Sequence, residues 1–82
     1  MPWEEQAYSK YQRMLALIPV FHRGIAKEVV NKKAEMLAQG RGSSCVEEVD
    51  IVAAFFSEVP KAFYSMMVRI MDEVGFNYKA HR

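Results

Sequence analysis

The sequence predicts a single all-α domain, a small bundle of three to four helices. Apolar residues recur at steps of three and four along most of the chain, and prolines and glycines divide it into helix-length segments. Its 82 residues are enough for one compact domain and too few for two. We expect one domain over residues 1–82, with a core over about 3–59, an additional helix over about 61–74 and a tail over 75–82.

The first expected helix runs from Pro2 to Ile18. Glu4 and Glu5 lie in its first turn and Arg13 toward its end, which is the order that the helix macrodipole favours. Its apolar stripe comprises Trp3, Ala7, Tyr11, Met14, Leu15 and Ile18.

A longer helix is predicted from Pro19 to about Gln39. Pro19 suits a first helical turn, because its missing N–H has no intrahelical partner there. The glycines and serines of residues 40–44 then end the helix. One broad apolar face carries Phe21, Ile25, Ala26, Val29, Val30, Ala34, Met36 and Leu37.

The start of the third helix is predicted from a capping box, in which Ser44 caps the helix and Glu47 reaches back to it. The helix should follow at once. Pro60 either ends it near Glu58 or kinks it. The expected inner stripe is Val46, Val49, Ala53 and Phe56, with Ile51, Val52 and Phe55 beside it.

The fourth helical pattern follows Pro60, and Gly75 can terminate it. Its apolar positions are Phe63, Met66, Met67, Ile70, Met71 and Val74. The three methionines cannot all face one way, so some sulfur should reach the surface, which favours partner contact or self-association. Beyond it, Phe76 and Tyr78 are expected to fold back against the body of the domain.

Charge and cysteine content exclude several protein classes. Eleven Lys and Arg nearly balance ten Asp and Glu, so nucleic acid is not favoured. A basic stripe is interleaved with acidic residues, which indicates a solvated helix face. It comprises Arg23, Lys27, Lys32 and Lys33. The single cysteine excludes an intramolecular disulfide, which favours the cytoplasm. Neither a signal peptide nor an apolar run of about 20 residues is present, so we expect no membrane span.

Cys45 and the two histidines are the remaining candidates for chemistry. Cys45 is either a reactive thiol at a helix N-terminus, with Arg41 adding positive charge, or a small residue that fills a first turn. His22 and His81 are too far apart for a recognisable metal motif. We therefore expect no metal site, no resident cofactor and no catalytic residue set, and no enzyme activity of the chain on its own.

The segment from Ile18 to Gly24 joins the end of one helix to the start of the next. Phe21 supplies an apolar anchor, whereas His22 and Arg23 lie in a first turn, where free N–H groups favour anions. Arg23 has two alternative roles. One is an interhelix ion pair with an acid such as Asp50 or Glu47, which is favoured, and the other is contact with an anionic ligand.

The chain resembles the small C-terminal helical domain of the B subunit of light-independent protochlorophyllide reductase, which also occurs as short free-standing proteins. The matching residues lie within about 3–56, and the pattern Ile18-Pro19-x-Phe21-x-Arg23-Gly24 is its most specific part. The other matching positions are Trp3, Glu5, Ala26, Ala34, Val49, Ala53 and Ala54. The resemblance implies a three-helix core and an ancestry in a reductase that reduces a tetrapyrrole ring. This chain departs from the family at two places. It has Asn31 where the family often has an acidic residue, and its loop at residues 40–43 is longer.

These patterns predict an accessory helical module that docks on a protein partner, such as a reductase complex handling a tetrapyrrole or another redox cofactor. The presented surface would consist of Trp3, Phe21, His22 and Arg23. An alternative is a small-ligand domain, in which the Met-rich fourth helix holds a planar tetrapyrrole and Arg23 meets a propionate. A nucleic-acid-binding module is less favoured.

Overall fold

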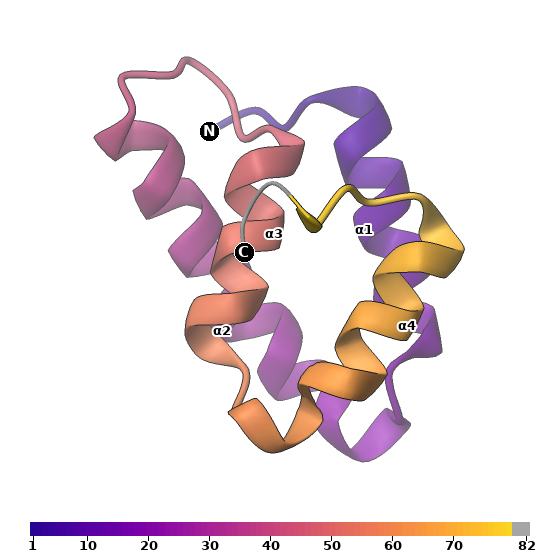
Figure 1. Cartoon of the computed structure of the whole chain (residues 1–82). Coiled ribbons are helices and arrows are strands. Elements are labelled where there is room, and N and C mark those ends of the chain that lie inside the picture. Colours follow the sequence, from indigo (N-terminus) through magenta and orange to yellow (C-terminus); the bar gives the residue numbers. More distant parts are fainter. Residues whose placement is uncertain (80–82) are drawn as a thin grey trace.

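Within residues 1–79, which the computed structural model describes, four α-helices and one short 3-10 helix form the predicted all-α bundle (Figure 1). The elements are α1 (Glu5–Leu17), α2 (Val20–Gly40), α3 (Glu48–Glu58), η1 (Lys61–Phe63) and α4 (Tyr64–Val74). Helix α2 packs most extensively against α3, and α1 contacts α2, α3 and α4. The last three residues of the predicted tail, 80–82, lie outside the described residues.

Helix α1 begins three residues later than predicted, because Glu4 is its cap. The Glu4 carboxylate accepts the N–H groups of Ala7 at 2.8 Å and Gln6 at 3.1 Å, and these two hydrogen bonds lower the pKa of Glu4. The preceding residues are extended. The Glu4 N–H donates to the carbonyl of Val46 at 2.7 Å, and the Val46 N–H donates to the carbonyl of Pro2 at 2.9 Å. The N-terminal segment therefore pairs with the segment before α3 instead of extending α1.

The connection between α1 and α2, which we call the elbow, consists of Ile18 and Pro19. Ile18 caps the end of α1 with extended backbone, which the following proline favours by steric exclusion of the helical region. Pro19 lies just outside α2, with φ −51° and ψ 137°, rather than in its first turn. The predicted end of the first helix is confirmed, and the start of the second is one residue late.

The predicted capping box at Ser44 is wrong, because α3 begins at Glu48. Its cap is Glu47, whose N–H donates to the Asp50 carboxylate at 2.9 Å. Residues 44 and 45 form a bend, and Val46 pairs with the N-terminal segment, so the helix does not begin there. The same capping chemistry therefore occurs three residues further along the chain.

The inner face of α3 is also rotated relative to the predicted stripe. Val49 is 55% exposed and Phe56 is only partly buried. The buried side chains are those that the sequence placed beside the stripe, namely Ile51, Val52 and Phe55, together with Ala54 and Asp50. The later helix start explains the error, because a stripe counted from Val46 follows the wrong helical phase.

From the end of α3 to Tyr78, the chain follows the prediction closely. Helix α3 ends at Glu58, so Pro60 starts a new element instead of kinking the old one. Helix α4 ends at Gly75, whose φ of +89° is in the left-handed region. The Phe76 N–H then donates to the carbonyl of Met71 at 2.9 Å, and the Phe76 side chain is 3% exposed. Phe76 thus folds back on the core, and Tyr78 packs against it.

No single helix among residues 1–79 is both long and apolar enough to span a membrane; α3 and the Lys61–Val74 segment reach the required length and hydropathy only together, across a bend of 118°.

The core is built around Tyr11 of α1, which is completely buried. Its single O–H proton has two acceptors within reach, the Asn31 side-chain oxygen and the Lys27 carbonyl at 3.3 Å, so the phenol is satisfied inside the core. Burial raises the pKa of Tyr11. Its ring packs on Trp3 at 5.2 Å and on Phe55 at 5.9 Å between centroids, which ties α1, α3 and the N-terminal segment together.

Two glycines are expected to respond to alanine in opposite directions. Gly75→Ala should lower the free energy of unfolding by about 1 kcal/mol, because Ala strains a left-handed backbone. Gly24→Ala should raise it by about 0.5–1 kcal/mol, because Gly24 is helical and a Cβ there meets nothing within 4 Å. Urea unfolding of both variants checks the pair, and equal effects would contradict the assigned backbone conformations.

Candidate functional site

Arg23, in the first turn of α2, ties the elbow to the end of α1. Its Nη2 donates to the carbonyls of Ala16 at 3.1 Å and Ile18 at 2.9 Å, and its Nε donates to Ile18 at 3.3 Å. These carbonyls belong to the last turn and cap of α1, where intrahelical donors run out and a cation is favoured. Arg23 therefore fixes the direction in which α2 leaves α1.

The predicted ion pair of Arg23 with Asp50 or Glu47 is wrong. Arg41, which follows α2, pairs with both carboxylates instead. The physical reason is position along α2, because Arg23 lies in its first turn and α3 begins close to its last turn. The alternative that Arg23 also meets an anionic group stays a prediction.

A patch of exposed apolar side chains surrounds the elbow. Phe21 is 88% exposed, Ile25 is 68% exposed and Val20 is 66% exposed. Such exposure is unusual for side chains of this size in a domain whose core is small. We call this surface the elbow patch, and it comprises Leu17, Val20, Phe21, Ile25 and Phe63.

An apolar groove of about 250 Å³ opens beside the elbow patch. One wall is the first half of α2, and the other is the corner between α3 and α4, which lies at the same end of the bundle as the elbow (Figure 1). Both His22 and Phe63 line it, and their rings contact each other with centroids 5.7 Å apart and planes tilted by 47°. Its lining residues include Ile18, His22, Ile25, Val29, Glu58 and Met66.

The two walls of the groove end on opposite charges. The start of α2 has no acidic residue in its first turn and no side-chain cap, so its free N–H groups leave that end positive. Helix α3 has no basic residue in its last turn and ends on Glu58, which lines the groove and adds to the negative end of the helix dipole. The Arg23 guanidinium binds the carbonyls at the end of α1 instead, and Arg23 is not part of the groove lining.

Trp3 does not join the other predicted interaction residues. The 13 residues of α1 separate it from the elbow, a helix length of roughly 20 Å. Its indole Nε1 donates to the Glu35 carboxylate at 3.1 Å, and its ring stacks on Tyr11. The structure thus brings Phe21, His22 and Arg23 together at the elbow and places Trp3 at the opposite end of α1.

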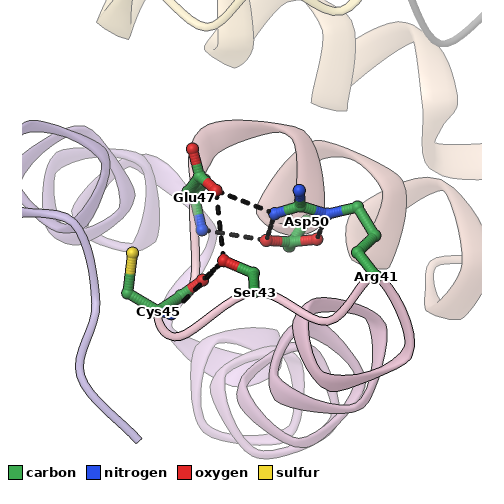
Figure 2. A network of polar contacts seen from close by, with 5 residues as sticks. All are labelled: Arg41, Ser43, Cys45, Glu47 and Asp50. Atoms are coloured by element: carbon green, nitrogen blue, oxygen red, sulfur yellow. Dashed lines mark hydrogen bonds and ion pairs between the residues drawn. The ribbon is translucent and has the colours of Figure 1, made fainter.

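A second polar cluster joins the end of α2 to the start of α3 (Figure 2). The Arg41 guanidinium donates to Asp50 through Nε at 2.9 Å and through Nη2 at 2.7 Å, and to Glu47 at 3.1 Å. Burial of Asp50 alone would raise its pKa. The hydrogen bonds from Arg41 and from the Glu47 N–H outweigh burial and hold the pKa of Asp50 below its ordinary value. We call this cluster the clasp.

Sequence reasoning missed the clasp, although a signal was present. Asp50 lies between Val49 and Ile51 in an otherwise apolar stretch, and an acid on an inner helix face requires a buried partner. The cations near it in sequence include Arg41, which follows the glycine that ends α2.

Cys45 lies beside the clasp but outside a helix. It lies in a bend three residues before Glu48, the first residue of α3, so the premise that it occupies a helical first turn is wrong. Figure 2 shows its sulfur directed away from the ion pair, while its backbone bonds to the Ser43 hydroxyl. Neither predicted source of thiol activation, the helix N-terminus or a free Arg41, is therefore in place.

The fourth helix does not present a row of methionines to a ligand. Met67 and Met71 are 2% and 0% exposed and belong to the core, whereas Met66 lines the groove. A groove of about 250 Å³ is also smaller than the roughly 300–1,000 Å³ of pockets that hold drug-sized ligands. The geometry thus favours side chains of a protein partner over a tetrapyrrole as the occupant.

Comparisons with protein families, with curated proteins and with solved structures found no match to this chain. The resemblance carried by the Ile18 to Gly24 pattern therefore stays a prediction.

Removing the Arg23 side chain should destabilise the elbow. Arg23→Ala is expected to lower the free energy of unfolding by about 1–2 kcal/mol, because three hydrogen bonds to α1 carbonyls are lost. Arg13→Ala removes an exposed arginine of α1 that lies before its last turn, and this variant should stay within about 0.5 kcal/mol of the original chain. Urea unfolding at neutral pH measures both, and an unchanged Arg23→Ala variant would refute the capping role.

The clasp predicts a specific acid sensitivity. Because the folded pKa of Asp50 is lowered, its stabilisation is fully present above the ordinary value of 3.8 and is lost as the pH falls below that toward the folded pKa. Asp50→Asn should therefore cost about 2 kcal/mol at pH 7 and flatten the decline of stability in acid. Chemical unfolding at successive pH values tests this, with exposed Glu73→Gln as the control; parallel pH curves for Asp50→Asn and the original chain would contradict it.

Proposed function

We propose that this chain is a protein-interaction module that docks through the elbow patch. The observation that carries the proposal is Phe21, whose side chain is 88% exposed in the middle of other exposed apolar residues. A buried Phe contributes roughly 1.5–3 kcal/mol through removal from water, and the fold itself forgoes that gain. An interface that covered Phe21 would recover it.

The position of the elbow patch suits a docking surface. Arg23 holds the elbow from within, so the apolar side chains around it are presented on a connection that is fixed at both ends. The adjoining groove offers a concave apolar seat for a projecting side chain of the partner. A projecting aromatic beside a pocket is the arrangement found at the centres of many protein interfaces.

We further propose that the partner belongs to a tetrapyrrole or redox system. Support for this partner class comes from the resemblance of Ile18-Pro19-x-Phe21-x-Arg23-Gly24 to the reductase subunit domain. In the structure, this run is the elbow together with the first residues of α2. The same residues thus carry the resemblance and the exposed patch.

Site-specific photocrosslinking in cells tests docking directly. A photoreactive amino acid at position 25 should give a discrete adduct, identified by mass spectrometry, and the same group at exposed Gln39 should not. Adding Phe21→Ser should abolish the adduct while leaving the free energy of unfolding within about 0.5 kcal/mol, because Phe21 is almost fully exposed.

Met36→Ser is the matched control. Met36 is also an exposed apolar residue of α2, at 55% exposure, but it lies outside the elbow patch. It should leave the adduct at position 25 intact. Absence of any adduct at position 25, or adducts equal to those at position 39, would refute docking through this surface. An adduct with an enzyme of tetrapyrrole or redox metabolism would support the proposed partner class, and an adduct with any other kind of protein would refute that class alone.

A further inference from the structure

The elbow patch carries both a projecting side chain and a seat for one. Phe21 stands out from the first turn of α2, and the groove begins at the next residue, His22. An apolar cavity of about 150 Å³ already accommodates a benzene ring. The groove of about 250 Å³ is therefore large enough for the ring of a phenylalanine.

The charges of the patch are also self-complementary. The positive wall is the start of α2, whose N–H groups have no side-chain cap, and the negative wall ends on Glu58, which lines the groove. The net charge of the whole chain is only +1, so two copies do not repel each other strongly. The surface thus has a projecting Phe21, a groove that can receive it, and charges of both signs. Such a surface fits a twofold dimer, in which each contact occurs twice.

We infer that a second copy of this chain covers the elbow patch when no other partner does, with Phe21 of each copy seated in the groove of the other. This inference rests on the proposed function, because it assigns an occupant to the same docking surface. Phe21 is in the first turn of α2, so its insertion brings the positive start of that helix against Glu58 of the second copy. The dimer thus holds the docking surface closed, and a heterologous partner must displace the second copy.

Sedimentation equilibrium of the purified full chain measures this pairing. The expected result is a concentration-dependent dimer with a Kd below about 1 mM. Phe21→Ser should raise that Kd by about 30-fold, the loss typical of a central interface residue. The control Met36→Ser should leave it within about threefold, because Met36 lies outside the patch.

Charge reversal separates the pairing from a general effect on folding. Glu58→Lys and His22→Glu should each raise the dimer Kd by about tenfold, because each places like charges opposite one another. Both changes also suit their own helix dipoles, so each should raise Tm by a few degrees. The double variant should restore the original Kd to within about threefold. Glu73→Lys, another acid-to-base change near a helix end, should leave the Kd unchanged.

A chain that stays monomeric up to about 1 mM, or a double variant that fails to regain the original Kd, would overturn the inference. Growth into larger assemblies instead of a dimer would also overturn it, because a twofold contact closes. A monomer in solution combined with an adduct to another protein at position 25 would overturn this inference and leave the proposed function standing. A dimer together with no adduct to any other protein would support the inference and refute heterologous docking.

Discussion

The buried carboxylate of Asp50 is the constraint on which the rest of the fold depends. A charge that is 2% exposed is tolerated only with a full set of donors, and Arg41 and the Glu47 N–H provide them. This pairing closes the segment between α2 and α3, the most extensive helix pair in the molecule. The closed segment in turn holds Val46 in place, and Val46 pairs with the residues before α1. One ion pair thus couples three of the four helices.

Buried polar side-chain groups in the part of the chain that the structure describes are fully paired, whereas several large apolar side chains remain exposed. Among the described residues, every buried side-chain nitrogen and oxygen has a hydrogen-bond partner, including the phenol of Tyr11 inside the core. At the elbow, by contrast, Phe21 and Ile25 remain in water. A small domain buries only a limited fraction of its surface, so burying these two side chains in the core would have stabilised the fold. Their position on a rigidly held connection is consistent with the docking that we propose.

The order and type of the helices could be predicted from local signals. Pro19, Pro60 and Gly75 mark boundaries through their own backbone chemistry, and each boundary falls within a residue or two of the prediction. The start of α3 could not be predicted in this way, because Ser44 and Glu47 are both followed three residues later by an acidic residue and each could cap the helix. The pairing of Val46 with Pro2 and Glu4 decided between them, and these residues are more than forty positions apart in the chain.

The sequence by itself determined an all-α chain of three to four helices, the sharp elbow after Ile18 and the return of Phe76 to the core, because proline, glycine and apolar spacing act over a few residues. Only the tertiary structure decided the partners of the two arginines. Arg23 binds α1 carbonyls and Arg41 binds Asp50, since ion pairing depends on which helix ends meet. Tertiary packing likewise decided that Phe21 lies outside the core. Helix α3 covers the face of α2 that carries Val30, Ala34 and Ala38. At about 100° per residue, Phe21 lies about 180° around the helix from Val30, so it stays exposed.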